Sequence, residues 1–192
     1  MARFRKSSYT DREFFDGKHR FEHWYRDNTI YFLTSKVRDG KHAFRDERAR
    51  GIFWNRFDFY TDKYEFVPIV TSLMSNHYHT MGYLARGDNL GPLMQHLHGS
   101  VAKLVNDLLP QRHVPFWRFK GNKDYYDGCL RNEIQLKRTY HYIQAQCQWH
   151  RVAPDWRDYP DTHPHMTLDD ALKFAQQVQP FLPDVPYKRY DG

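Results

Sequence analysis

Two histidines one residue apart, His77 and His79, have the types and spacing in this 192-residue chain that best suit chemistry. They lie in an alternating apolar run, residues 73–84, that predicts a β-strand. Residues i and i+2 of a strand point to the same face, so the two imidazoles project side by side. Such a pair forms half of a divalent-metal site, provided that a third ligand arrives from elsewhere. The alternative is a pair of solvated or core-edge histidines.

Two other His-x-His pairs do not have this geometry. The chain contains 12 histidines, so such pairs arise by chance. His96 and His98 fall in a strong helical pattern, where residues i and i+2 diverge by roughly 200°. His163 and His165 lie in a proline-containing loop, where we expect no rigid element to hold them. Only the first pair therefore has a geometry that converges.

The overall charge favours a polyanionic partner. The chain has 29 Lys and Arg against 23 Asp and Glu, a net charge of +6, and it carries 14 Phe, 14 Tyr and 5 Trp. A basic surface suits nucleic acid better than membrane, and aromatic rings between basic residues could stack unpaired bases, although most aromatics fill the core.

The cellular compartment is predicted from the motifs and apolar segments that the sequence lacks. Cys129 and Cys147 form no Cys-x-x-Cys motif and no disulfide framework, as is typical of a reducing cytoplasm. No run approaches the ~18 apolar residues of a membrane span, and no apolar segment follows the basic first six residues as a secretory signal would require. We expect a soluble cytoplasmic protein that does not engage membranes.

The first half of the chain alternates between strand and helix patterns. An apolar, β-branched run at 29–35 predicts a strand buried on both faces. Apolar residues at spacings of three and four predict a helix from 46 to about 60. Strand character returns at 64–74, where Pro68 indicates an edge position or a bulge. The histidine strand, 77–84, comes next.

Two helices and a strand follow the histidine strand. A long apolar stripe between Asn89, as N-cap, and Pro110 predicts the clearest helix in the chain. We expect a fourth strand somewhere within 116–130. Asn132 and Gln135 then open another helix in the manner of a capping box, and its buried stripe comprises Leu136, Tyr140, Ile143 and Cys147.

This order of elements predicts an α+β fold. A β-α-β-β-α-β sequence is typical of the ferredoxin-like arrangement, an antiparallel sheet with both helices on one side. The open sheet face could then receive the additional C-terminal helix and an extended ligand. Residues 1–26 form a basic N-terminal arm, 27–153 the main domain, and 154–192 an appendage with one short helix, 168–178, capped by Thr167.

The additional helix carries a second set of polar side chains. Arg138, Tyr142 and Gln146 are spaced i, i+4 and i+8, so we expect them to share one exposed face. Tyr140 lies on the buried stripe instead. Because this face is turned away from the stripe, it is where we expect the chemistry.

Four segments, in order, resemble one protein family. Residues 74–79, Met-Ser-Asn-His-Tyr-His, resemble the Met-Pro-Asn-His-hydrophobic-His strand of the HUH-superfamily single-tyrosine transposases. Residues 116–120 resemble their Leu-Trp-Gln-x-x-Phe/Tyr segment, and 142–146 align with their Tyr-Ile-x-x-Asn/Gln. Residues 158–160 match the tail of the same block. The branch that the chain resembles most is the REP-associated tyrosine transposases and related insertion-sequence transposases, with Ser75 in place of their proline and Gln146-Cys147 in place of their Asn-Pro.

The resemblance implies a catalytic site within residues 27–153. Tyr142 would be a nucleophile, and His77, His79 and Gln146 would be catalytic ligands of Mg²⁺ or Mn²⁺ acting on a phosphate. A phenol is a weak nucleophile at neutral pH, so the metal or a nearby cation must assist it. The substrate would be single-stranded DNA, at a site with an adjacent hairpin, and the product a 5′-phosphotyrosine. The candidate DNA-binding residues are Asn76, Trp117, Arg118, Lys120, Lys123, Arg131 and Arg138.

Three alternatives stay open. A binding module could hold DNA or RNA hairpins without cutting them. A rolling-circle replication initiator or relaxase of the same superfamily would use the same motif, although the short chain disfavours it. A ferredoxin-like RNA-binding or RNA-processing protein could use the basic aromatic segment alone. The pattern does not decide between a monomer and a homodimer.

Overall fold

A computed structural model describes residues 25–118 and 123–179 of the chain. Nearly all of the predicted N-terminal arm lies outside these residues, as does Lys120. Within the described ranges, none of the helices combines the length and apolar character that crossing a lipid bilayer requires.

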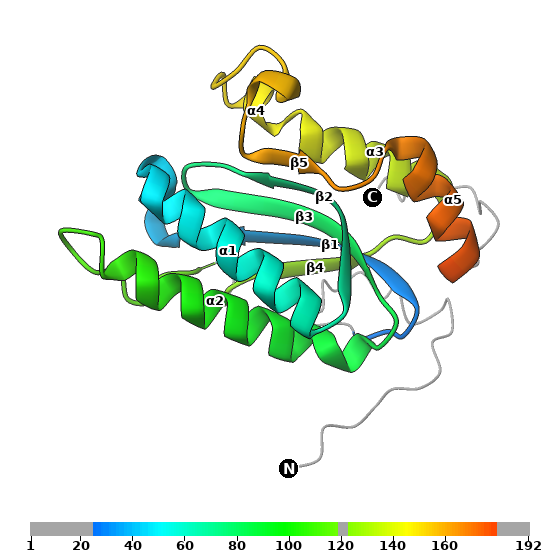
Figure 1. Ribbon diagram of the computed structural model, residues 1–192, viewed down its shortest axis with the longest axis horizontal. Helices are drawn as coiled ribbons and strands as arrows, with labels where there is room; N and C mark the ends of the chain where they lie inside the picture. The colour runs from blue at the N-terminus through cyan, green and yellow to red at the C-terminus, as the bar shows by residue number, and fades with distance from the viewer. Residues whose placement is uncertain (1–24, 119–122, 180–192) are drawn as a thin grey trace, which may run out of the picture.

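A five-stranded antiparallel sheet forms the centre of the molecule (Figure 1). Its order is β4-β1-β3-β2-β5, so β1 and β3 are central neighbours. Most of the apolar residues in the three strands predicted at 29–35, 64–74 and 77–84 are buried. The strands are β1 Thr29–Lys36, β2 Phe66–Leu73, β3 His77–Leu84, β4 Tyr126–Cys129 and β5 Thr162–Pro164.

Helices cover both faces of this sheet (Figure 1). On one face lie α1 Glu47–Lys63 and α2 Leu90–Asn106; on the other lie α3 Glu133–Gln144, α4 Gln146–Trp149 and α5 Leu168–Val178. The predicted β-α-β-β-α-β fold with a further helix on the open face is confirmed. Four short 3-10 helices complete the described elements: Arg38–Gly40, Ala43–Arg45, Gly87–Asn89 and Trp156–Asp158.

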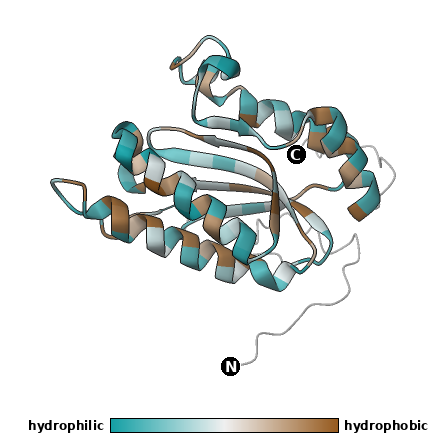
Figure 2. Ribbon diagram, in the orientation of Figure 1, coloured by the Kyte–Doolittle hydropathy of each residue, from teal (hydrophilic) through white to brown (hydrophobic). Residues whose placement is uncertain are grey.

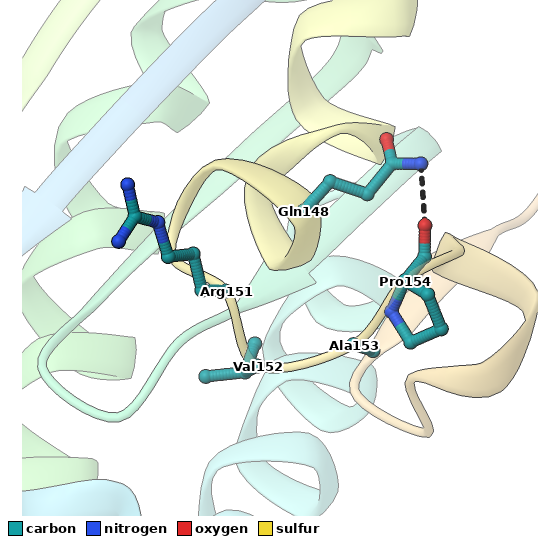
Figure 3. Close-up of a pocket in the computed structure, with 5 residues that line it drawn as sticks. All are labelled: Gln148, Arg151, Val152, Ala153 and Pro154. Carbon is teal, nitrogen blue, oxygen red and sulfur yellow. Dashed lines mark hydrogen bonds between the residues drawn. The ribbon is translucent and has the colours of Figure 1, made fainter.

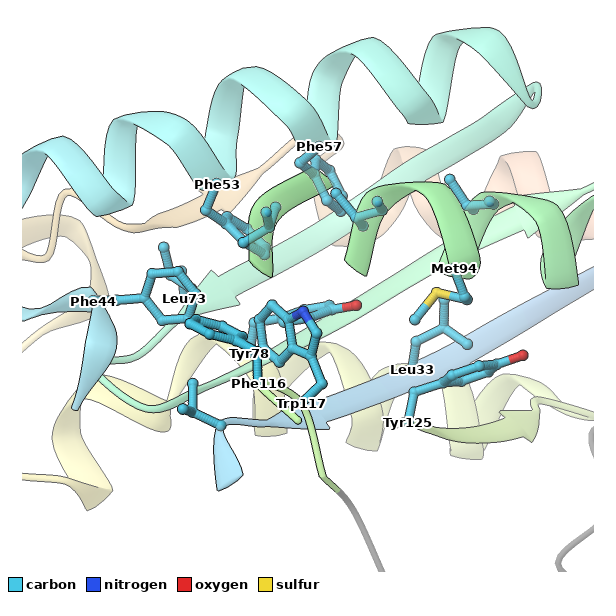
Figure 4. Packing of buried hydrophobic residues seen from close by; sticks show 14 of the residues in the cluster. Leu33, Phe44, Phe53, Phe57, Leu73, Tyr78, Met94, Phe116, Trp117 and Tyr125 are labelled. Carbon is cyan, nitrogen blue, oxygen red and sulfur yellow. The ribbon is translucent and has the colours of Figure 1, made fainter. Parts of the chain in front are cut away.

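Each sheet face has its own hydrophobic core. The core under α1 and α2 is rich in aromatic rings, among them Phe44, Phe53, Tyr78 and Trp117 (Figure 4). The apolar stripe of α2 alternates with polar residues along the helix (Figure 2), and its apolar side is buried against this core. The core under α3 and α5 is smaller and mainly aliphatic. Because one core packs against each face of the sheet, side chains on either face of β3 are constrained by packing.

The start of α2 differs from the prediction. Asn89 precedes the helix, but its side chain makes no cap bond and donates instead to the carbonyl oxygen of Tyr64 at 3.0 Å. The reason is that the 3-10 helix Gly87–Asn89 runs directly into α2, so Asn89 already has helical backbone angles and cannot serve as an ordinary N-cap.

β2 confirms the prediction for its proline. The register with β3 shifts between Pro68 and Val70, which is a β-bulge. On the other side of β2, the short strand β5 pairs only with Val70, Thr71 and Ser72. Pro68, which has no N–H to donate, therefore lies at a bulge beyond the end of the β5 pairing.

The C-terminal segment supplies a strand as well as its predicted helix. The helix is α5, and Thr167 caps it by accepting from the Asp170 N–H. The expectation that His163 lies in a loop without a rigid element is wrong, because Thr162–Pro164 form β5. The His163 ring also stacks on Trp54 with centroids 3.8 Å apart. A three-residue strand is too short to produce a periodic signal, and this one depends on its partner β2.

Candidate active site

The two histidines of β3 lie on the sheet face that α3 and α4 cover. Their ring centroids are 5.0 Å apart, and His77 and His79 are 9% and 5% exposed. The neighbouring Tyr78 points to the opposite face and packs into the aromatic core (Figure 4). This is the alternation expected of a strand, and it places both imidazoles side by side in a buried environment.

Hydrogen bonds fix how each imidazole is turned. Asn76 donates from Nδ2 to the carbonyl oxygen of Gly40 at 3.0 Å, which leaves its Oδ1 to accept from His77 Nδ1 at 2.7 Å. Thr34 Oγ1 is hydrogen-bonded to His79 Nδ1, also at 2.7 Å. Both Nδ1 atoms are thus engaged, and His77 keeps its lone pair on Nε2. Engagement of one ring nitrogen by a neighbouring oxygen is the usual arrangement around a metal-binding histidine.

Burial keeps both histidines neutral. It lowers the pKa of His77 to about 4, with the nearby His150 adding to the effect, and that of His79 to about 3, with His77 and His150 contributing. The amide of Gln146 acts in the opposite direction on both rings. Because the neutral imidazole is the form that ligates metals, the pair is in its ligating form at neutral pH.

Gln146 brings a third donor atom to the two rings. The side chain is 1% exposed, and its Nε2 donates to the carbonyl oxygen of Tyr142 at 3.0 Å. Its Oε1 therefore faces His77 Nε2, at 3.5 Å. With His77 protonated on Nδ1, this contact joins two lone pairs and is not a hydrogen bond.

The same contact suits a shared cation. Two ligands that each lie about 2.1 Å from one ion are separated by roughly 3.0–3.4 Å, close to the distance between His77 and Gln146. Two imidazoles and one amide oxygen fit a divalent ion such as Mn²⁺ or Mg²⁺. Among the described residues, no three His, Cys, Asp or Glu side chains group as metal ligands; the Gln146 amide is an oxygen donor that faces the histidine pair.

Gln146 reaches this position by a route that differs from the prediction. α3 opens as predicted, with Asn132 accepting from the Gln135 N–H, but it ends at Gln144. Ala145, with ψ at 0°, interrupts the helix, and Gln146 begins α4. The expectation that Gln146 shares one exposed helix face with Arg138 is therefore wrong. After this break the Gln146 amide lies buried, whereas Arg138 remains exposed one turn before Tyr142.

Tyr142 lies next to the histidines. Its ring centroid is 5.2 Å from that of His79 and 5.8 Å from that of Phe32, in edge-on contacts. The ring is half-buried, less open to solvent than predicted. Tyr140, two residues earlier, is buried as predicted and donates its hydroxyl to the carbonyl oxygen of Met166 at 2.7 Å. The phase of α3 thus brings Tyr142, and not Tyr140, to the histidines.

Two residues of α4 and its C-cap join the site without having been predicted. Trp149 makes an edge contact with Tyr142, with centroids 5.0 Å apart, and His150 lies 4.9 Å from His77. They follow Gln146 by three and four positions, which is the spacing of one helix face. That spacing is the signal that could have identified them.

The candidate DNA-binding residues divide into several groups. Trp117 does not serve as a stacking surface, because it is 5% exposed, lies in the aromatic core and donates its indole N–H to the carbonyl oxygen of His98 at 3.1 Å. Asn76 is half-buried and holds His77 in place. The basic candidates are spread in exposure: Arg118 and Arg138 are exposed, and Lys123 and Arg131 are half-buried.

The pair on α2 diverges as predicted. His98 is buried between Tyr78 and Asp124, with hydrogen bonds of 2.8 and 2.9 Å, on the sheet face away from the site. His96 lies elsewhere on the helix, its ring stacked on that of Tyr60 with centroids 6.0 Å apart. Neither belongs to the histidine site.

An open hollow of 390 Å³ lies beside the site, at the loop after α4 (Figure 3). None of the predicted site residues lines it. Gln148 donates to the carbonyl oxygen of Pro154 at 2.8 Å and closes the loop around the hollow. The lining residues are Gln148, Arg151, Val152, Ala153 and Pro154.

Comparison with known proteins identifies the fold. No protein-family profile and no curated protein matches the chain. A solved structure of a REP-associated tyrosine transposase bound to a REP hairpin is similar, with a TM-score of 0.61 and 14% identity over 86% of this chain and 92% of that one. A candidate transposase from Deinococcus radiodurans R1 aligns with a TM-score of 0.44 and 15% identity over 61% of this chain and 89% of its own. The first comparison shows that this chain has the fold of a tyrosine transposase.

Proposed function

We propose that this chain is a metal-dependent transposase that cleaves and rejoins single-stranded DNA through a 5′-phosphotyrosine intermediate. The observation that carries the proposal is the contact between the Tyr142 and His79 rings, with Gln146 facing His77, on a tyrosine-transposase fold. A nucleophile and a ligand set converging from separate elements fit such a reaction better than a purely structural role.

The ligand set would consist of His77, His79 and Gln146. A bound Mg²⁺ or Mn²⁺ ion would act as a Lewis acid that withdraws charge from the scissile phosphate. The imidazoles favour Mn²⁺ in affinity, because Mg²⁺ prefers shells of oxygen ligands. Asn76 and Thr34, which engage the Nδ1 atoms, hold the two rings in their ligating orientation.

Tyr142 would supply the attacking oxygen. Its Oη forms a bond to phosphorus as the bond from phosphorus to the 3′-oxygen breaks, and the phenolic proton is balanced by the proton that the departing 3′-oxygen gains. The DNA is left with a 5′-phosphotyrosine and a free 3′-hydroxyl. Because the number of phosphodiester bonds is conserved, the reverse reaction rejoins a strand without an energy source. Arg138, exposed one turn earlier on α3, would add positive charge near the phosphate.

The substrate would be a flexible single strand next to a hairpin. In-line attack by a ring held on a helix requires freedom in the phosphate backbone that a duplex lacks. The similar solved structure carries a REP hairpin, which supports a folded DNA element as the partner. The net charge of +6 suits this partner, and Arg118, Lys120, Lys123 and Arg131 are the proposed phosphate contacts.

A covalent-adduct assay tests the proposal. The protein is incubated with labelled single strands of random sequence flanked by a hairpin, in Mn²⁺, and then denatured in detergent. Wild type and Tyr140→Phe should yield a labelled protein band, whereas Tyr142→Phe should yield none and a chelator should abolish the wild-type band. Tyr140→Phe is the matched control because it removes the same hydroxyl two residues away.

Two results would overturn the assignment. An adduct that persists in Tyr142→Phe would move the nucleophile elsewhere. Retention of the hairpin DNA by wild type without any adduct would leave a binding protein that does not cut.

A further inference from the structure

Trp149 is unusually exposed for a side chain in contact with a catalytic candidate. It is 61% exposed, whereas Gln146 on the same helix is 1% exposed. A single exposed hydrophobic residue is ordinary on a protein surface. Trp149 differs because its ring is in edge contact with the Tyr142 ring, at 5.0 Å and an angle of 73°. One side of the indole thus contacts the nucleophile while most of its area faces solvent.

The main chain that carries the indole is held by hydrogen bonds. The backbone N–H of Trp149 donates to the carbonyl oxygen of Ala145 at 3.0 Å, and the chain beyond it folds back so that the backbone N–H of Val152 donates to the carbonyl oxygen of Cys147 at 2.9 Å. Gln148 then fastens the end of the loop to Pro154 (Figure 3). A main chain that is fixed before binding loses little conformational entropy when a ligand stacks on a side chain that it carries.

α4 and its C-cap therefore present three different groups to one place. Gln146 turns its amide to the histidines, His150 lies against His77, and Trp149 covers Tyr142 from outside. Exposure to solvent increases from the buried Gln146 amide to the exposed Trp149 indole. A substrate that brings a phosphate to Tyr142 would also bring an adjacent group close to Trp149.

We propose that Trp149 is a stacking subsite for a DNA base adjacent to the scissile phosphate, an inference that rests on the proposed function. An unpaired base is the group that a single strand offers next to a phosphate, and its flat face matches an exposed indole. In a duplex that face is covered by neighbouring bases. Stacking on Trp149 thus favours strands whose bases are unstacked at the cleavage site. It fills the role that Trp117, buried in the core, cannot.

A double-mutant cycle between the ring and the bases tests this subsite. The probes are a 20-nucleotide oligodeoxythymidine and an abasic 20-mer with the same sugar-phosphate backbone. Trp149→Leu keeps an apolar group against Tyr142 but removes the flat ring. We expect it to weaken oligodeoxythymidine binding by about 5- to 150-fold, the range for loss of one base–aromatic stack, and to leave abasic binding unchanged.

A matched control is Phe59→Leu. Phe59 is 52% exposed but lies on α1, across the sheet from the site, so its replacement should change neither affinity. Trp149→Phe should restore most of the loss, because a smaller aromatic ring still stacks. A general structural defect would instead weaken the binding of both probes together.

The outcomes separate this inference from the proposed function. Equal loss on the two probes, no loss on either, or no measurable wild-type binding of oligodeoxythymidine would overturn the stacking subsite. Tighter binding of a 20-mer oligouridine than of oligodeoxythymidine would overturn its assignment to DNA. Adduct formation by wild type is scored in parallel: if the adduct forms and the cycle shows no coupling, only the role of Trp149 fails.

Discussion

Acid should destabilise this protein through His77 and His79. Burial lowers their pKa values from the ordinary 6.5 to about 4 and about 3 in the folded chain. As the pH falls below 6.5, the unfolded chain takes up protons on these two groups while the folded chain does not. Their contribution to stability is therefore complete above about pH 7 and is lost progressively between pH 6.5 and the folded pKa values.

The size of the effect follows from the pKa values. A histidine that stays neutral in the folded state loses about 1.36 kcal/mol of stabilisation for each pH unit below its unfolded pKa. At pH 5 this gives about 2 kcal/mol for each of the two residues and about 4 kcal/mol for the pair. Such a loss is a large part of the 5–15 kcal/mol typical of a folded domain, so it should be readily measurable.

This loss of stability is measured by urea unfolding at pH 7.5 and 5.0, followed by circular dichroism in the presence of a chelator. The reference is a variant with His77→Asn and His79→Asn, in which an amide replaces each Nδ1 and cannot titrate. Between pH 7.5 and 5.0, the free energy of unfolding of wild type should fall by about 4 kcal/mol more than that of this variant. Other histidines with a lowered pKa, such as His165, are present in both proteins, so their effects on the pH dependence cancel. Equal losses in the two proteins would refute the account of a buried, neutral pair.

Three further substitutions test how the elements are held together. Gly82→Ala would place a Cβ against the Phe66 ring and 2.7 Å from the Val67 carbonyl oxygen of the neighbouring strand β2. It should lower the free energy of unfolding in urea by about 1–3 kcal/mol; an unchanged midpoint would contradict the close strand packing. Asp161→Ala removes a carboxylate that lies 3.0 Å from the Arg50 guanidinium and accepts from the Trp54 indole N–H at 2.8 Å; we expect faster proteolysis near β5 than in wild type, and equal rates would show that these bonds do not anchor this strand. Thr167→Ala removes the cap of α5 and should cost about 1 kcal/mol, whereas Thr167→Ser should be close to neutral; equal losses in both variants would argue against the cap.

Much of the fold could be predicted because the signals are local. The alternation in 77–84, the apolar stripe of α2 and the caps of α3 and α5 depend on residues within a few positions of one another. Each reports which side of an element is buried, and the ferredoxin-like order follows from their succession. The same local rule separated Tyr142 from Tyr140, because two positions on a helix differ by about 200° in direction.

The predictions that were wrong concern residues whose surroundings are formed by segments distant in sequence. Trp117 follows a basic, irregular segment, and only its packing beneath α2 removes it from solvent. β5 exists because β2 offers it a free edge. The break at Ala145 turns Gln146 inward, although no glycine or proline marks it in the sequence. For Trp117 and β5 the stabilising contact is tertiary, so no periodicity or composition could reveal it.

The candidate site combines both kinds of information. The sequence by itself determined that His77 and His79 share one strand face, since the pleat of a strand allows no other arrangement. Only the tertiary structure decided that Gln146, 69 positions later, faces His77 and that an exposed Trp149 lies against Tyr142. The physical reason is that α3, together with α5, docks on the sheet through a separate, mainly aliphatic core, and this docking sets the distance between strand and helix side chains.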